Sequence, residues 1–103
     1  MSERRDNERH LIRRFALLKL ASGELIEGQT QDMSVGGAFI ECDADRDLQE
    51  GEACTITLIL EDDDESISTE IYGNITHRED EGVGCNFLKI NSAYYQFMSG
   101  YFD

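Results

Sequence analysis

Residues 54–60 read CTITLIL and form the clearest strand signal in the chain. Apolar side chains at positions 54, 56, 58 and 60 alternate with Thr55, Thr57 and Ile59, which is the two-residue period of a strand with one buried face. Further short β-like segments lie on both sides of this stretch, separated by turn residues: 15–20, 25–30, 38–42, 67 to about 78, and 83–87. Six such segments predict an all-β fold, either a small antiparallel barrel or a sandwich.

An acidic run, EDDDE at residues 61–65, directly follows the central strand. It lacks the alternating ligand spacing, the glycine and the distal glutamate of an EF-hand loop, so a solvated hairpin tip is favoured over a calcium site. Residues 79–82, EDEG, predict another turn before the last strand.

The C-terminal residues change from a period of two to a period near 3.6. Asn91 or Ser92 is suited to cap a helix. Four aromatic or apolar side chains then recur at the spacing i, i+3, i+4 and i+7: Tyr94, Phe97, Met98 and Tyr101. We expect a helix over 91–103 whose stripe packs against the strands. Tyr95 and Phe102 widen the apolar surface, so a partner-binding face is the alternative.

The 103 residues are enough for one domain, and no proline, repeat or linker divides them. We expect a charged, mobile arm at 1–13, a β-barrel body at 14–90 and a C-terminal helix at 91–103. No apolar run approaches the ~18 residues that span a bilayer, and the N-terminal residues do not resemble a signal peptide. We therefore expect a soluble, cytoplasmic protein without membrane insertion.

Three cysteines, Cys42, Cys54 and Cys85, lie far apart in apolar stretches. An odd, scattered set of this kind predicts reduced thiols in a cytosolic protein rather than disulfides. Neither His10 nor His77 stands near a cysteine at the spacing of a zinc site, so we expect no metal.

The net charge of −13 is unevenly distributed. Residues 1–19 hold six basic and three acidic side chains, a net of +3, which leaves −16 on the other 84 residues. Such an acidic body repels the phosphate backbone of DNA or RNA and argues against nucleic-acid binding. A compact anion is still compatible with the basic N-terminal residues, although a solvated charged terminus is the simpler interpretation.

Two short motifs bear on ligand chemistry. Arg5 and Arg9 are four residues apart, which places them on one side of either a helix or a strand. The arginine fork suits phosphate and the O6/N7 edge of guanine. Residues 32–37, DMSVGG, combine a carboxylate and a hydroxyl two positions apart with two glycines that permit positive φ and close approach of a ligand. An ordinary Asx or Ser turn is the alternative.

In this order and separation the two motifs resemble those of the PilZ domain family, which has Arg-x-x-x-Arg followed by (Asp/Asn)-x-Ser-x-x-Gly. Arg5 and Arg9 match the first motif, and Asp32, Ser34 and Gly37 match the second. Residues 73–77, GNITH, and 82–87, GVGCNF, also resemble paired strands of the family, so the similarity covers nearly the whole chain.

The resemblance implies a six-stranded antiparallel β-barrel with a C-terminal α-helix and, as ligand, cyclic di-GMP, often bound as an intercalated dimer. It also implies that the arm arginines contact phosphates and guanines, and that the Asp/Ser turn holds a guanine edge. Many members carry an aromatic residue near the position of His77. Arg4 extends the arm to consecutive arginines, which in similar proteins goes with the dimeric ligand. The ligand-binding residues expected here are Arg4, Arg5, Arg9, Asp32, Ser34, Gly36, Gly37 and His77.

The function that follows is a bacterial cyclic di-GMP receptor that changes conformation on binding and signals to a partner protein. In this hypothesis ligand phosphates draw the arm against the barrel mouth. The alternative is a PilZ-like adaptor that contacts proteins without nucleotide. We expect no enzyme and no catalytic residue, because the chain has no nucleophile elbow, no phosphate loop and no histidine beside a plausible nucleophile.

Overall fold

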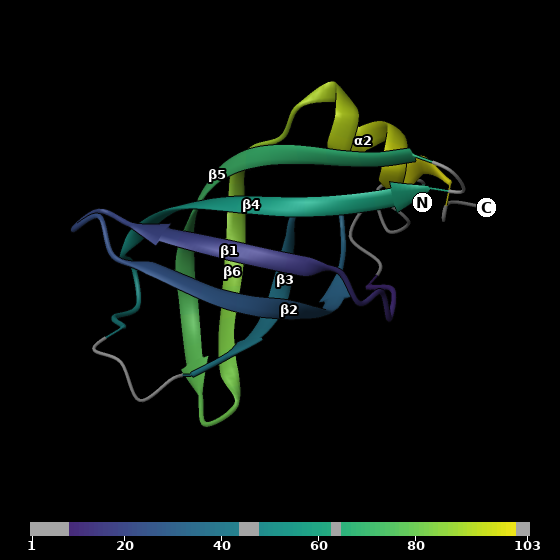
Figure 1. Ribbon diagram of the computed structural model, residues 1–103. Coiled ribbons are helices and arrows are strands. Elements are labelled where there is room, and N and C mark those ends of the chain that lie inside the picture. The colour runs from purple at the N-terminus through teal and green to yellow at the C-terminus, as the bar shows by residue number, and fades with distance from the viewer. Residues whose placement is uncertain (1–8, 44–47, 63–64, 101–103) are drawn as a thin grey trace.

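The computed structural model describes residues 9–43, 48–62 and 65–100, and six strands in these ranges close into one barrel (Figure 1). The strand order around the barrel is β1-β2-β3-β6-β5-β4, and every neighbouring pair is antiparallel. The elements are β1 Phe15–Leu20, β2 Leu25–Met33, β3 Gly37–Cys42, β4 Ala53–Asp62, β5 Glu65–Glu79, β6 Gly82–Lys89 and α2 Ser92–Ser99. The predicted all-β architecture, a six-stranded antiparallel barrel with a C-terminal helix, is confirmed.

The alternation that predicted the strands also fills the barrel. Ile56 and Leu58 of β4 are fully buried, while Thr55 and Thr57, which alternate with them, are only half-buried. The fully buried interior is dominated by aliphatic side chains from all six strands, among them Leu18, Ile26, Ile40, Ile71, Ile75 and Val83. Cys54 and Cys85 are buried, Cys42 is half-buried, and none of the three forms a disulfide. A closed barrel needs this inward row on every strand, which is why the two-residue period identifies all of them.

β2 is longer than the sequence predicts. It continues past Thr30, because its pairing with β3 resumes after a bulge and joins Asp32 to Phe39 and Met33 to Ala38. Asp32 and Met33 are therefore strand residues, and the turn expected over 32–37 is shortened to the three residues between β2 and β3.

The acidic run lies at the end of the hairpin formed by β4 and β5. β4 ends at Asp62 and β5 begins at Glu65, and these two residues pair; residues 63–64 lie outside the described residues. β5 extends over 15 residues, close to the predicted strand from 67 to about 78. It is long because its first part pairs with β4 and its second part with β6.

The residues just before β1 lie on the barrel. His10 and Met33 exchange two backbone hydrogen bonds of 2.8 and 2.9 Å. Ile12 is buried in the core, and its carbonyl oxygen accepts a 2.6 Å hydrogen bond from the hydroxyl of Thr30. The sequence placed the end of a mobile arm at residue 13, whereas the structure attaches the chain to β2 from His10 onward. Arg4 and Arg5 lie outside the described residues.

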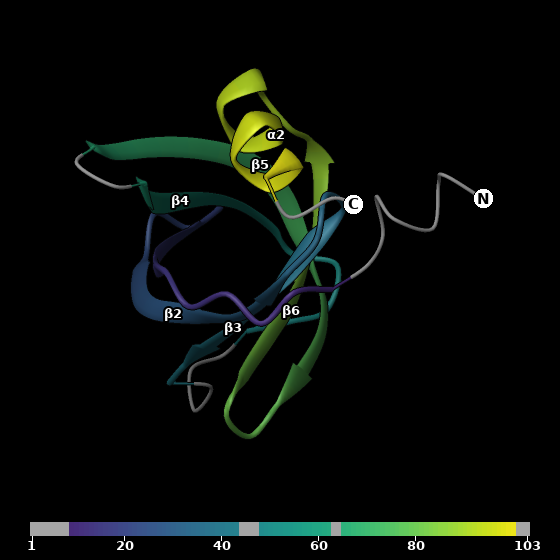
Figure 2. The same ribbon diagram turned by 90° about the vertical axis from the view of Figure 1, so that its right-hand side faces the viewer.

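Helix α2 lies beside β5 in both ribbon views (Figures 1 and 2). Its cap is Asn91, whose side-chain oxygen accepts a hydrogen bond from the backbone N–H of Tyr94 at 2.9 Å. The Asn91 amide also donates to the Thr69 hydroxyl and to the Glu70 carbonyl of β5. Tyr94 and Met98 are buried as predicted. The helix ends at Ser99, earlier than the predicted 103, and residues 101–103 are outside the described residues.

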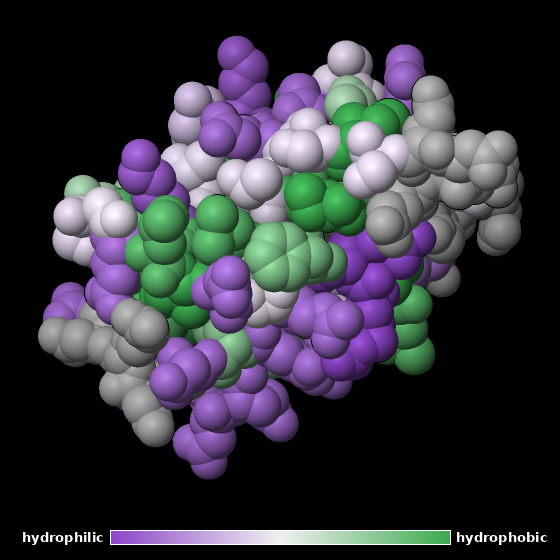
Figure 3. Space-filling view, in the orientation of Figure 1, coloured by the Kyte–Doolittle hydropathy of each residue, from purple (hydrophilic) through white to green (hydrophobic). Residues whose placement is uncertain are grey.

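The outer surface mixes hydrophilic residues with apolar patches, as the face in Figure 3 shows. Leu25, Tyr72 and Leu88 are more than half exposed. In the described ranges, no helix has the length and hydropathy needed to cross a bilayer.

Candidate functional site

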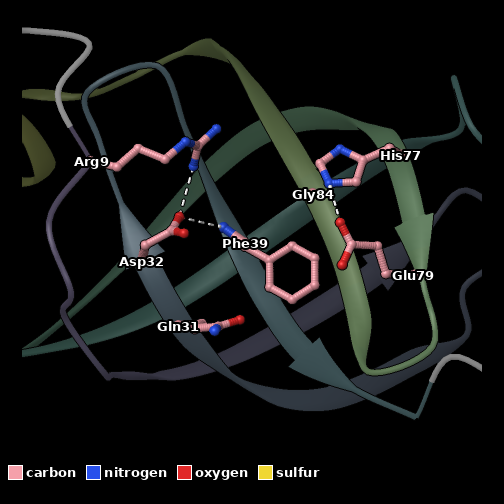
Figure 4. Close-up of a pocket in the computed structure, with 7 residues that line it drawn as sticks. All are labelled: Arg9, Gln31, Asp32, Phe39, His77, Glu79 and Gly84. Atoms are coloured by element: carbon pink, nitrogen blue, oxygen red, sulfur yellow. Dashed lines mark hydrogen bonds and ion pairs between the residues drawn. The ribbon is translucent and has the colours of Figure 1, made fainter.

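A pocket of about 290 Å³ opens on the outer face of the barrel, over β2, β3, β6 and the end of β5 (Figure 4). Its lining combines one guanidinium, two carboxylates, two rings, an amide and a glycine: Arg9, Asp32, Glu79, Phe39, His77, Gln31 and Gly84. Three of the residues predicted from the sequence, Arg9, Asp32 and His77, meet here. The volume is at the low end for ligand pockets, which suits one nucleobase and its nearest phosphate better than a large ligand in full.

Arg9 and Asp32 form the polar end of the pocket. Nη1 of Arg9 donates to Oδ1 of Asp32 at 2.7 Å, and the same oxygen accepts the backbone N–H of Phe39 at 3.3 Å. Two donors from different elements therefore fix this carboxylate, whose side chain is 23% exposed. The Arg9 side chain is 52% exposed and keeps further N–H groups with which to bind an anion.

A bulge places two consecutive residues of β2 on the pocket. In a regular strand Gln31 and Asp32 would point to opposite faces. The register shifts between Thr30 and Asp32, and as a result both side chains line the same pocket. Bulges commonly redirect side chains in this way beside binding sites.

Two rings form the other end of the pocket. Phe39 of β3 and His77 of β5 both pair with Gly84 of β6, so the three residues form a row across the sheet. The ring centroids are 5.9 Å apart and the planes are inclined by 28°. A Cβ at residue 84 would overlap the imidazole, so the missing side chain is what lets the ring of His77 lie over β6. We call Phe39, His77 and Gly84 the ring platform.

A second bulge and a carboxylate orient the histidine. The register of β5 shifts between Ile75 and His77, and the Thr76 hydroxyl donates to the Gly84 carbonyl at 3.1 Å. Nε2 of His77 lies 3.3 Å from Oε2 of Glu79. Because His77 is 47% exposed and Glu79 is 52% exposed, both groups are open to a ligand or to water.

The three remaining predicted residues in the described ranges shape the turn after β2 and do not line the pocket. Ser34 is 4% exposed, and both its backbone N–H and its hydroxyl donate to the Gly37 carbonyl, at 2.8 and 3.3 Å. The Gly36 carbonyl accepts from the backbone N–H of Phe87 at 2.8 Å.

The glycines of this turn are not needed for a left-handed backbone, contrary to the expectation from sequence. Among the described residues, glycines with positive φ are Gly23 and Gly51, in two other turns. A Cβ at Gly37 would overlap the carbonyl oxygen of Cys85 on β6. Gly37 is therefore required by the close approach of β3 and β6.

Sequence reasoning missed four lining residues: Gln31, Phe39, Glu79 and Gly84. The sequence could have identified one of them, because Phe39 alternates with Ala38 and Ile40 and so belongs to the outer face. Gln31 and Glu79 have no comparable signature. Their place on the pocket depends on strand pairing between distant segments.

Comparison with known proteins gives one family match and similar solved structures. The family model for the PilZ domain matches residues 3–101. The crystal structure of the PilZ domain of CeSA from a cellulose-synthesising bacterium has a TM-score of 0.73 at 15% identity, covering 93% of this chain and 95% of that chain. The structure of the Bacillus subtilis inhibitor of motility, MotI/DgrA, has a TM-score of 0.77 at 14% identity, covering 90% of this chain and 46% of that chain. No curated protein matches at a significant level. At these identities the two structures show a shared fold.

Proposed function

Because this chain belongs to the PilZ domain family, we propose that it is a cyclic di-GMP receptor that binds its ligand at the pocket of Arg9, Asp32 and His77. The observation that carries the proposal is the chemistry of this one pocket. An anion-binding guanidinium, an acceptor carboxylate and a pair of rings lie together on its lining. A guanine nucleotide presents the three complementary features: a phosphate, an edge with N–H donors and a flat base.

Each group has a distinct role in this proposal. Arg9 binds a phosphate oxygen through charge-assisted hydrogen bonds. Asp32 accepts hydrogen bonds from the N1–H and N2–H groups of guanine, because a carboxylate offers only acceptors. The ring platform gives the base a surface for stacking, in which the flat imidazole of His77 is the more exposed member.

The predicted residues outside the pocket complete the proposal. Arg4 and Arg5 add phosphate contacts next to Arg9 and favour an intercalated ligand dimer. Ser34, Gly36 and Gly37 act through the turn, which sets the direction in which β2 passes Asp32 and then leaves the pocket. No cofactor and no catalytic step are required.

Binding has to disturb an existing ion pair, and this is where a signal would begin. Arg9 already lies on the pocket and donates to Asp32. A ligand phosphate competes with the carboxylate for the guanidinium, while the guanine edge competes for the carboxylate. The exchange of partners changes the surface around residues 9–14, which we propose a downstream protein recognises in the cytoplasm of a bacterium.

Isothermal titration calorimetry with cyclic di-GMP, and with GTP as the control nucleotide, tests the receptor. We expect saturable binding of cyclic di-GMP and much weaker binding of GTP, which has no second guanine for the intercalated dimer proposed above. Absence of heat at ligand concentrations up to about 100 μM, where only weak complexes escape detection, would reject the receptor.

The adaptor that binds a protein without nucleotide is the second candidate. It is favoured by Tyr95 on α2, which is 45% exposed although it is a large aromatic side chain. Phe102, the other residue of that predicted apolar face, lies outside the described residues. If the folded protein shows no binding of cyclic di-GMP by calorimetry, the receptor is rejected and the adaptor remains the candidate.

A further inference from the structure

The turn between β2 and β3 is held from three directions. Within the turn, the Ser34 backbone N–H donates to the Gly37 carbonyl. From β6, the Phe87 N–H donates to the Gly36 carbonyl. From α2, the Tyr94 hydroxyl donates to the Ser34 carbonyl at 2.5 Å, across 60 residues of sequence. Side chains of α2 thus reach a backbone atom two residues after Asp32.

Burial and ring packing hold the Tyr94 side chain in one position, from which its hydroxyl donates. Tyr94 is 0% exposed and is the largest fully buried side chain among the residues that the structure describes. Its ring packs edge-on against Phe87 with centroids 5.2 Å apart and planes at 89°. Burial raises the pKa of its hydroxyl, and the nearby charge of Arg9 partly opposes this rise. The hydroxyl therefore stays protonated and able to donate at neutral pH.

The residue between Asp32 and Ser34 ties β2 to the chain before β1. Met33 is 0% exposed and is hydrogen-bonded to His10 through both its backbone groups. His10 directly follows Arg9, so Arg9, Asp32 and the Ser34 carbonyl belong to one short hydrogen-bonded unit. The donor to the Ser34 carbonyl, Tyr94, belongs to the first turn of α2. Asn91 caps this turn and bonds it to β5.

We infer that Tyr94 is a positioning residue: its hydroxyl holds the turn after β2 in the shape that presents Asp32, and it couples the ligand pocket to helix α2. This inference rests on the proposed function for its ligand, but the coupling of turn and helix exists in the free protein as well. By linkage, a ligand that stabilises the turn also stabilises the position of α2, and the loss of the hydroxyl weakens both effects.

Hydrogen exchange of the ligand-free proteins tests the coupling without any ligand. Tyr94→Phe keeps the buried ring and removes only the donor. Ile71→Val, a substitution of a buried residue of β5, is the control for a general loss of stability. We expect Tyr94→Phe to speed exchange of the Ser34 and Phe87 amides more than Ile71→Val does, relative to the rest of the barrel. If Tyr94→Phe and Ile71→Val change the exchange rates of these two amides equally, relative to the rest of the barrel, the inference is wrong.

Calorimetry with cyclic di-GMP tests the link to the pocket. If the turn is in its binding-competent shape for only a fraction of the time, the apparent Kd rises by the inverse of that fraction, and we expect Tyr94→Phe to raise it about three- to tenfold. Tyr72→Phe, which removes the same hydroxyl from a side chain that is 61% exposed, should bind as the wild type does. In the wild type, bound ligand should also slow exchange at residues 95–99, and this protection should be lost in Tyr94→Phe.

The outcomes separate the two proposals. If the wild type binds and Tyr94→Phe binds with the same Kd, Tyr94 does not position the site and the inference fails, even if exchange in the turn is faster. If the wild type does not bind, the receptor is rejected, and the exchange comparison of the free proteins alone decides whether Tyr94 couples turn and helix.

Discussion

At the scale of single residues, two arginines four positions apart have nearly the same surroundings and different expected roles. Arg9 and Arg13 are 52% and 53% exposed, and each forms an ion pair with a carboxylate, at 2.7 Å to Asp32 and 2.8 Å to Glu41. Only Arg9 lines the pocket. Because both are about half exposed and each pairs with a carboxylate, Arg13, which also donates to Gln29, is a control for the loss of one exposed, paired arginine.

We predict that Arg9→Ala weakens cyclic di-GMP binding by about 1.5–3 kcal/mol, the usual contribution of hydrogen bonds to charged groups. The melting temperature of the free protein should change little, since an exposed ion pair contributes about 0–1 kcal/mol. Calorimetry and differential scanning fluorimetry measure the two effects. Arg13→Ala should leave affinity nearly unchanged, and an equal loss of affinity in both variants would mean that general charge, not the pocket, attracts the ligand.

The ring platform supports a second prediction. In Gly84→Ala the new Cβ overlaps the imidazole, and because His77 is 47% exposed its ring can swing out to solvent without loss of the fold. We expect Gly84→Ala and His77→Ala each to reduce affinity by about 1–3 kcal/mol, as removal of a stacking ring does elsewhere. The double variant should lose no more than either single one, since both remove the same contact. Additive losses in calorimetry would contradict the platform.

At the scale of elements, two irregularities in otherwise regular strands build the site. The bulge of β2 brings Gln31 and Asp32 to one face, and the bulge of β5 precedes His77. Neither strand loses its place in the barrel, because the pairing resumes after one residue. Helix α2 depends in a comparable way on one residue, Asn91, which joins its first turn to β5.

We predict that Asn91→Ala lowers the free energy of unfolding by about 1–2 kcal/mol, because it removes the helix cap and two hydrogen bonds to β5. Asn91→Asp keeps the acceptor for the Tyr94 N–H and loses only the donors to Thr69 and Glu70. It should therefore be intermediate in urea unfolding followed by circular dichroism. A wild-type midpoint for the alanine variant would show that α2 is held by its buried face alone.

The tyrosine that joins α2 to the turn also predicts a response to alkaline pH. The pKa of Tyr94 in the folded protein is raised above its ordinary value of 10.0, mainly by burial. Below about pH 10 the hydroxyl is protonated in both states; above it, the unfolded chain releases a proton that the folded protein keeps, so stability falls as pH rises. Tyr94→Phe lacks this loss.

The stability difference between wild type and Tyr94→Phe should therefore narrow between about pH 9 and about pH 11, because only the wild type has the additional ionisation in its unfolded state. Urea unfolding at a series of pH values measures it, and the other tyrosines and the cysteines cancel because both proteins contain them. If the free energy of unfolding falls equally with pH in the two proteins, the pKa of Tyr94 is not raised.

At the scale of the whole molecule, the net negative charge and the closed barrel together determine the repulsion across the surface. The chain has a net charge of −13, and its N-terminal residues are the basic exception. Closure of the barrel removes free sheet edges, so the acidic residues are not needed to prevent edge pairing and remain a source of repulsion across the surface. The same field opposes long polyanions, and in the proposed function it leaves the pocket beside Arg9 as the place where an anion binds.

We predict that the free protein gains stability with salt, because screening weakens this repulsion at a Debye length of about 8 Å near physiological ionic strength. Thermal unfolding near neutral pH in about 10 mM and about 300 mM NaCl should show a melting temperature higher by a few degrees in the higher salt. At about pH 5, closer to the sequence pI of 4.3, the same step should produce a smaller gain. A melting temperature that falls with salt would mean that attractive ion pairs such as Arg9–Asp32 outweigh the repulsion.

The sequence by itself determined the elements of this protein. Alternation at residues 54–60 and its five counterparts predicted every strand, and the spacing from Tyr94 to Met98 predicted the helix, because side-chain periods are local properties of the backbone. The paired motifs around Arg9 and Asp32 also indicated the family. Element ends were less accurate, since β2 continues past its predicted end at Thr30 for as long as β3 offers hydrogen bonds.

Only the tertiary structure decided which residues share the site. Gln31 faces the pocket because of a bulge, and Phe39, Gly84 and His77 meet because three strands pair in one register. Ser34, grouped with Asp32 by sequence, turns inward to the hydroxyl of Tyr94. The physical reason is that the two-residue period is a property of each segment's own sequence. Register, bulges and the partners of a turn carbonyl instead depend on hydrogen bonds between segments far apart in the chain.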